Sequence, residues 1–233
     1  MFHVRVVKHG ENSHLRQKGK IAELALGYGG GINAMKAMGA IENGMKEEEL
    51  QPIVDAWRAA SPNVTKFWWD VDSLVKRAIQ YPGQIFVLPA AGGNVKLVAK
   101  RSNRILSIQL PSGRCIRYFD PDIGINKFGS ESVTYYGLEA GKWGQLESYG
   151  PKIVENIVQA TSRDCLRDAM LRAAERLPDI VMHIHDEMVI EVPKDEAEKS
   201  LDYMKYCMGT PLEWAPGLLL RGDGYITDYY RKD

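Results

Sequence analysis

The alternation of apolar and polar residues along the chain predicts helices first, strands in the middle and a mixture of both at the end. Apolar residues recur with a helical period over five segments, residues 15–26, 46–60, 64–80, 151–177 and 194–208. Shorter runs with strand periodicity cover residues 85–88, 95–99, 104–110 and 115–119. Residues 123–150 are rich in glycine and aromatic residues and are predicted to be irregular. Together these segments predict an α+β fold.

The same pattern gives finer predictions. Asn63 is predicted to cap the helix over residues 64–80, Asp72 to lie on its solvated side, and the Trp68–Trp69 pair to pack in the core and not to form a stacking platform. Asp120-Pro121-Asp122 is predicted to be a turn, and residues 218–229 are predicted to add a last strand. Asn156 and Asp164 are placed on the polar line of the helix over residues 151–177.

Two apolar runs near residue 185 enclose a charged tripeptide. Residues 180–182 precede it, residues 188–190 follow it, and the period predicts a strand, a tight turn and a second strand. The turn is His185-Asp186-Glu187 and lacks the glycine, asparagine or proline that such turns favour. Two adjacent carboxylates repel each other, and a divalent cation with oxygen ligands would offset that repulsion. The same residues also fit a solvated acidic turn, and the pattern leaves both interpretations open.

The first predicted helix carries a chemically mixed stripe on one face. Arg16, Lys20, Leu24 and Tyr28 follow one another at four-residue spacing, and a glycine cluster beginning at Gly29 then ends the helix. Two cations followed by an apolar residue and an aromatic ring suit an extended anion with a flat apolar end, such as a nucleoside triphosphate. A helix with a solvated basic end and a core tyrosine fits the pattern equally.

The strand-rich middle contains a concentration of positive charge. Residues 95–119 hold six basic residues and no acid, namely Lys96, Lys100, Arg101, Arg104, Arg114 and Arg117. A basic ribbon of this kind fits a DNA backbone, because phosphate contacts require only charge and reach. It also fits an exposed ribbon that is kept soluble by its charge.

Bulk composition restricts the class of protein only loosely. The chain has 233 residues, 30 Lys+Arg and 30 Asp+Glu, so its formal net charge is zero and generalised affinity for nucleic acid is not indicated. Its three cysteines fit neither a disulfide framework nor a zinc-binding spacing, which favours a reducing compartment. No run approaches the ~18 apolar residues of a membrane span, so no membrane partner is expected.

The stripe and the charged turn together resemble two motifs of family A DNA polymerases, the group of bacterial DNA polymerase I and its phage relatives. The residues that carry the resemblance are Arg16-x3-Lys20-x7-Tyr28-Gly29 and, far downstream, His185-Asp186-Glu187. The resemblance covers essentially the whole chain and is of the phage or prophage type. It implies a helical fingers-like subdomain over residues 1–150 with a basic β-hairpin insertion. It also implies a partial antiparallel palm sheet with packed helices over residues 151–233.

The resemblance assigns the fingers stripe to the incoming dNTP. It implies that Arg16 and Lys20 bind the triphosphate and that Lys20 also donates a proton to the leaving pyrophosphate. Tyr28 would close over the templating position, and Gly29 would let the backbone approach closely. Leu24 departs from the family, which usually has phenylalanine or tyrosine at the position that packs on the sugar.

The charged turn is assigned by the same resemblance to two-metal catalysis. Asp186 is implied as a ligand of Mg²⁺, Glu187 as an auxiliary metal-binding carboxylate and His185 as a contact near the primer terminus. On the long helix that precedes the turn, Gln159, Asn156 and Arg163 are implied DNA contacts in the minor groove of the primer–template. Asn156 lies three residues before Gln159, whereas the family spacing of four falls on Glu155.

The family's first motif, an Asp-Tyr-Ser-like strand that carries the principal metal-bridging aspartate, has no counterpart in these residues. Glu11 is the only acid before Glu23. We therefore expect a carboxyl-terminal polymerase segment that is active only with a second polypeptide carrying that motif, the thumb and the exonuclease. A truncated, inactive remnant that at most binds DNA or nucleotide is the alternative. The implied location is the bacterial host cytoplasm.

An unrelated metallohydrolase built on His183-x-His185-Asp186 is a third possibility at the level of the sequence. It requires further ligands, and the remaining histidines are His3, His9 and His14, all within the amino-terminal arm. The shortage of ligands places this interpretation below the two polymerase-based ones.

Overall fold

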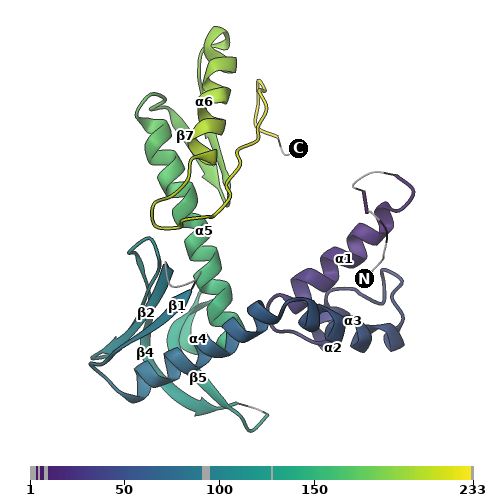
Figure 1. The fold of residues 1–233 in the computed structure, drawn as a ribbon, viewed down its shortest axis with the longest axis vertical. Coiled ribbons are helices and arrows are strands. Elements are labelled where there is room, and N and C mark those ends of the chain that lie inside the picture. Colours follow the sequence, from purple (N-terminus) through teal and green to yellow (C-terminus); the bar gives the residue numbers. More distant parts are fainter. Residues whose placement is uncertain (1–3, 5, 8–9, 91–94, 127, 232–233) are drawn as a thin grey trace. The chain divides into compact units, whose positions relative to one another are not determined.

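The fold of this chain is α+β, as the pattern of apolar residues predicts (Figure 1). It is a computed structural model that describes residues 4, 6–7, 10–90, 95–126 and 128–231. The helices are α1 (Ser13–Leu26), α2 (Ile32–Ala37), α3 (Glu47–Ala60), α4 (Pro62–Gln80), α5 (Gly150–Ala174) and α6 (Ala197–Gly209), with a 3-10 turn at Lys194–Glu196. The strands are β1 (Ile85–Ala90), β2 (Val95–Ser102), β3 (Ile105–Gln109), β4 (Cys115–Ile125), β5 (Glu131–Glu139), β6 (Lys142–Ser148), β7 (Ile180–Ile184) and β8 (Glu187–Ile190).

The chain divides into two compact units. Each consists of several segments, which alternate along the sequence with segments of the other unit. The first contains Met1–Phe86, Lys100–Leu106 and Tyr118–Asn156. The second contains Val87–Ala99, Ser107–Arg117 and Ile157–Asp233. Each unit has its own hydrophobic core.

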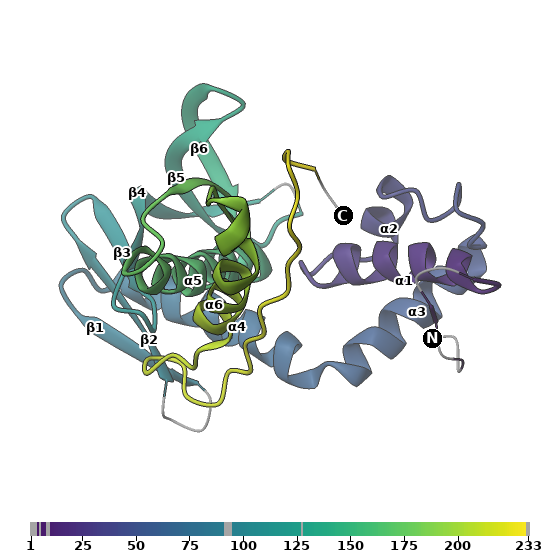
Figure 2. The same ribbon diagram turned by 90° about the horizontal axis from the view of Figure 1, so that it is seen from above.

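In the first unit, α1 packs on α2 and α3, as Figures 1 and 2 both show. The core of this bundle comprises Ile21, Ala22, Ala25 and Leu26 of α1 with Met35, Ala40, Met45, Leu50 and Val54 from the following segments. Because these apolar residues recur at helical spacing, they place one face of α1 in the core and leave the opposite face exposed. Removal of this much apolar surface from water is the dominant stabilising term of the bundle.

Six strands form one antiparallel sheet in the order β1-β2-β3-β4-β5-β6, so consecutive strands are neighbours (Figure 2). The predicted basic hairpin is therefore the centre of a larger sheet. The prediction that residues 123–150 are irregular is wrong, since β5 and β6 lie there and pair from Val133–Ser148 to Glu139–Lys142. Glycines in this segment suggested loops, but Gly137 and Gly144 are cross-strand partners inside the ladder. The aromatic residues around them have the stronger, strand-forming preference.

Three smaller predictions are also wrong. Asp72, expected on a solvated side of α4, accepts a hydrogen bond from the Gly150 backbone N–H at 3.1 Å and pairs with Lys76 at 2.8 Å. No side-chain cap precedes α4, which starts at Pro62 and not after a capping Asn63. Asp120 lies within β4 at an irregularity with φ 48°, and not in a separate turn.

In the second unit, the β7–β8 hairpin packs on α5 and α6. Its buried Met188 joins a core made of Leu166, Ala169 and Ala173 of α5 with Cys207 of α6. These α5 positions share one helical face, which explains why the hairpin lies along that face. Met188 directly follows Glu187, so the hairpin is anchored in this core close to its turn.

The carboxyl-terminal segment was predicted to add a strand over residues 218–229, and that prediction is wrong. Residues 218–231 contain no strand and run beside α6. A Cβ atom at Gly222 would lie 2.8 Å from the backbone of Lys205, and one at Gly224 would lie 2.9 Å from Leu201. Because these two glycines have no side chain, the segment can lie directly against α6, and it does so without the hydrogen bonds of a strand.

Within the described residues, each helix is either too short or too polar to cross a lipid bilayer.

Candidate nucleotide and metal sites

The predicted nucleotide-binding stripe lies on the exposed face of α1. Arg16, Lys20 and Leu24 are exposed, and Tyr28 is half-buried just beyond the end of the helix. Neither Arg16 nor Lys20 forms an ion pair or hydrogen bond within the described ranges. Two uncompensated cations next to an exposed leucine leave this face available for an anionic ligand with an apolar part.

Other polar residues of α1 serve the fold and lie off the stripe. The ammonium group of Lys18 donates to the Gly44 carbonyl at 2.7 Å, and Glu23 accepts a hydrogen bond from the Trp57 indole at 2.9 Å. These contacts fix α1 against the loop after α2 and against α3. The helix that carries the stripe is therefore held to its neighbours by residues outside the stripe.

Gly29 has a structural role that the sequence did not indicate. Its φ is 76°, in the left-handed region that favours glycine. A Cβ atom at this position would lie 2.5 Å from the ring of Pro151, so any side chain would force the two segments apart. Gly29 therefore allows the segment around Pro151, in the same chain, to approach the end of α1 closely.

The tip of the β7–β8 hairpin is a two-residue turn, His185-Asp186, between paired Ile184 and Glu187. His185 adopts φ 49° at the first turn position, where glycine is normally preferred. A non-glycine residue in this conformation costs on the order of 1–3 kcal/mol. Of the two adjacent carboxylates at this turn, that of Asp186 is exposed and that of Glu187 is half-buried.

Tyr230, which the sequence reasoning did not include, contacts one of these carboxylates. Its hydroxyl donates to Glu187 Oε2 at 3.4 Å. Partial desolvation and then the negative charge of Glu187 raise the pKa of Tyr230, so the hydroxyl keeps its proton and remains a donor. The segment is held nearby by an ion pair of 2.8 Å between Lys194 and Asp228. Only folding brings Tyr230 to the hairpin, so no local pattern could have indicated it.

Gln159 and Arg163 are exposed, one turn apart, on the same face of α5. Asn156, by contrast, is half-buried, and its amide donates to the Tyr118 hydroxyl at 3.0 Å. That contact joins α5 to β4 within the first unit. Asn156 therefore has a structural partner, Tyr118, which the DNA contact predicted from the sequence did not include.

The burial of Tyr118 beside this contact can be tested through pH. Burial raises the pKa of Tyr118 to about 12, against a partly opposing effect of the Asn156 hydrogen bond. Below the unfolded value of about 10, both states keep the proton and stability is unaffected. Between about pH 10 and 12 the unfolded chain loses its proton first, so stability should fall as pH rises. Denaturant unfolding at stepped pH should show this loss, and Tyr118→Phe should remove that part of it.

The basic residues of the middle strands do not form one free ribbon. Arg104 makes a two-point contact with Asp120, at 2.7 and 3.2 Å, and its guanidinium lies 4.7 Å from the Phe119 ring. Arg101 donates to the Ile79 carbonyl at 3.2 Å. Arg117 is exposed and has no partner in the part of the chain that the structure describes. The positive charge available to DNA is thus smaller than the sequence suggested.

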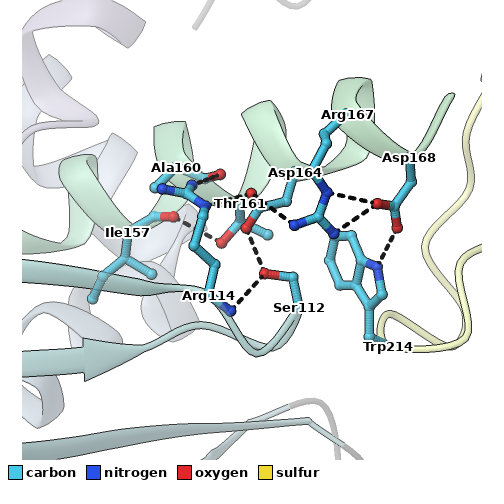
Figure 3. A network of polar contacts seen from close by, with 9 residues as sticks. All are labelled: Ser112, Arg114, Ile157, Ala160, Thr161, Asp164, Arg167, Asp168 and Trp214. Carbon is cyan, nitrogen blue, oxygen red and sulfur yellow. Dashed lines mark hydrogen bonds and ion pairs between the residues drawn. The ribbon is translucent and has the colours of Figure 1, made fainter. Parts of the chain in front are cut away.

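Arg114, from the same ribbon, belongs to a buried polar network between the β3–β4 turn and α5 (Figure 3). Its guanidinium binds Asp164 Oδ1 at 2.6 Å and the Ala160 carbonyl at 2.6 Å. The Ser112 hydroxyl donates to the other oxygen of Asp164 at 2.5 Å. Asp164 is 1% exposed, so its position on a solvated polar line of α5, expected from the sequence, is wrong.

The network continues along α5. Arg167 pairs with Asp168 at 2.7 Å and lies 3.9 Å from Asp164, and the Trp214 indole donates to Asp168 at 2.7 Å (Figure 3). The network thereby connects the β3–β4 turn, the middle of α5 and the loop after α6. It is a structural network, because every charge in it already has a protein partner.

The hairpin carboxylates are suited to a hard cation but supply only part of a coordination shell. Asp186 and Glu187 offer oxygen ligands of the kind that Mg²⁺ prefers. No group of three or more His, Cys, Asp or Glu side chains able to hold a metal occurs among the described residues. Mg²⁺ commonly binds one or two carboxylates and completes its shell with water and substrate phosphates, so the residues present fit such a role.

Comparison with known proteins identifies a relative that matches the chain from end to end. The chain is 46% identical over 235 aligned positions to a DNA polymerase of Bacillus phage SP02. The alignment spans 100% of this chain and 35% of the relative, so the chain is about one third of the length of the protein it matches. No family model matches the chain. No solved structure matches it either. The chain is thus similar to one segment of a phage DNA polymerase.

Proposed function

We propose that this chain is the nucleotide- and metal-binding segment of a template-directed DNA polymerase of family A. The observation that carries the proposal is the 46% identity, along the whole chain, to part of a phage DNA polymerase. The exposed stripe of α1 and the exposed tip of the β7–β8 hairpin add support, because each presents the chemistry that its motif requires. The proposed reaction joins a dNTP to the 3′ end of a primer.

In this proposal α1 binds the incoming dNTP. Arg16 and Lys20 hold the triphosphate through charge-assisted hydrogen bonds, and Lys20 donates a proton to the departing pyrophosphate. Leu24 packs against the sugar, and Tyr28 covers the base-pairing position. Since Leu24 is aliphatic and 40% exposed, it would contact the sugar without the ring stacking of an aromatic residue.

The hairpin tip would act at the reacting phosphate. Asp186 and Glu187 are the proposed ligands of Mg²⁺, which when bound supplies Lewis-acid stabilisation of the attacking and leaving oxygens. Tyr230 holds the Glu187 carboxylate in place, and His185 contacts the primer terminus. Gln159 and Arg163 on α5, with the carbonyl of Asn156, contact the duplex. Carboxylates beyond this pair must come from a further segment, in the same or another polypeptide, that carries the Asp-Tyr-Ser-like motif.

Primer extension in two contexts tests the proposal. The first sample is this chain alone. The second is a chimaera in which this chain replaces the matching third of the phage SP02 DNA polymerase. We expect extension by the chimaera and none above background by the chain alone. An inactive chimaera that folds and binds dNTP, but whose activity returns with the phage segment, would favour a degenerate remnant.

Substitution of the α1 cations should weaken dNTP binding. In the chimaera, Arg16→Met or Lys20→Met removes a charge-assisted contact worth about 1.5–3 kcal/mol, so the KM for dNTP should rise about 10- to 100-fold. Lys199→Met is the matched control, because it removes one exposed charge from α6. Equal KM values in all three variants would contradict the assignment of the stripe.

A further inference from the structure

A cavity in the first unit is lined, apart from Gly29, by residues outside the site described above. It has a volume of about 350 Å³. Its lining residues are Gly29, Arg58, Thr65, Trp68, Trp69, Tyr149 and Pro151. The volume lies near the lower end of the range for small-molecule pockets, so it offers room for one small ligand and not for an extended chain.

The walls of the cavity are mostly aromatic. Trp69 is 61% exposed and Tyr149 is 47% exposed, so both rings can be reached from solvent. Trp68 is buried and is backed by Trp57, whose ring stacks on it at 5.8 Å with an interplanar angle of 8°. Flat, accessible indole and phenol rings are the surfaces on which nucleobases stack. The sequence pattern assigned the Trp68–Trp69 pair to the core, which holds for Trp68 only.

One charged group in the lining lacks a compensating partner. Arg58 is exposed and contacts the Gly30 carbonyl at 3.3 Å, but no carboxylate pairs with it within the described ranges. Its guanidinium is therefore available to a phosphate, for which its planar donors are well suited.

We propose that this cavity binds a single nucleotide, with its base stacked on Trp69 and Tyr149 and its phosphate at Arg58. The nucleotide comes either from an unpaired stretch of a DNA strand or from a free mononucleotide. This inference rests on the proposed function, since a polymerase segment meets both.

The test compares two exposed tryptophans of the same unit. Trp69→Ala removes the proposed stacking ring, and Trp143→Ala is the control, because Trp143 is 60% exposed on β6. The 233-residue chain is titrated with a blunt DNA duplex, with the same duplex carrying an eight-thymidine 5′ overhang, and with dTMP. Trp69→Ala should weaken binding of the overhang duplex, or of dTMP, about tenfold, and leave the blunt duplex within twofold. Trp143→Ala should match the wild type throughout.

A second measurement locates the contact directly. An overhang with 5-iododeoxyuridine at successive positions should photocrosslink to Trp69 or Tyr149 at one position, and Arg58→Gln should reduce the yield about fivefold or more. Loss of overhang binding identifies the strand as the source, and loss of dTMP binding alone identifies the free nucleotide. If the wild type binds the overhang and blunt duplexes equally, ignores dTMP and crosslinks elsewhere, the inference is overturned while the proposed function stands. If it binds no DNA and no nucleotide, both are overturned.

Discussion

Asp186→Ala should reduce primer extension by the chimaera about a thousandfold, with little change in the affinity for DNA. Metal-assisted charge stabilisation contributes several kcal/mol to such a transition state, and about 4 kcal/mol corresponds to that factor. Asp186 is exposed at the hairpin tip and makes no hydrogen bond or ion pair within the described residues, so its removal should not disturb the fold. Single-turnover extension with a pre-bound primer–template is the appropriate measurement.

Asp202→Ala is the matched control for this prediction. Asp202 is an exposed aspartate of α6 without a partner among the described residues, and its loss should leave the extension rate unchanged. Mg²⁺ titration followed by the protection of the β7–β8 hairpin from hydrogen exchange gives a readout independent of activity. If Asp186→Ala and Asp202→Ala extend primers at the same rate, Asp186 is not a metal ligand and the hairpin is an ordinary acidic turn.

Arg114→Met should lower the free energy of unfolding of the chain by about 3 kcal/mol. The substitution leaves the Asp164 carboxylate, which is 1% exposed, with only the Ser112 hydroxyl and a cation of Arg167 3.9 Å away. Loss of one partner of a buried ion pair typically costs about 3–5 kcal/mol, and the lower value applies because the Arg114 side chain is 38% exposed. Urea unfolding followed by circular dichroism measures the change.

Two further variants distinguish the effect of leaving a buried charge unpaired from the general effect of removing an arginine. Arg117→Met, three residues further along in β4, removes an exposed arginine without a described partner and should change stability by about 0.5 kcal/mol or less. Arg114→Met combined with Asp164→Leu removes the unpaired charge and should recover much of the lost stability. Equal stability of Arg114→Met and Arg117→Met would show that the network does not stabilise the fold.

The sequence predicted correctly the elements whose structure depends on short-range periodicity. The helices over α1, α3, α4, α5 and α6 and the turn at His185-Asp186 follow from the spacing of apolar residues, which sets the buried face of each element. The prediction failed over residues 123–150, where cross-strand pairing places Gly137 and Gly144 inside a sheet. Strand pairing depends on a partner elsewhere in the chain, so glycine content alone could not decide it.

The partners of polar helix side chains were the other feature that the sequence predicted wrongly. Asp164, Asp72 and Asn156 were all expected on polar faces of helices, and each contacts a residue far away in the sequence. Whether a polar side chain on a helix faces water or another element depends on what packs there. Tyr230 illustrates the same limit at the hairpin tip, since the contact with Glu187 exists only because the last segment follows α6.

The sequence by itself determined the α+β class, the placing of Arg16, Lys20 and Leu24 on one face of α1 and the charged turn of the β7–β8 hairpin, because these depend on local period and on residue chemistry. The tertiary structure alone decided which charges remain available. It places Arg114 in a buried network and Arg104 against Asp120, and it leaves Arg16 and Lys20 without a described partner. It also brings Trp68, Trp69 and Tyr149 around one cavity. The physical reason is that pairing and burial depend on neighbours that only the folded chain brings together.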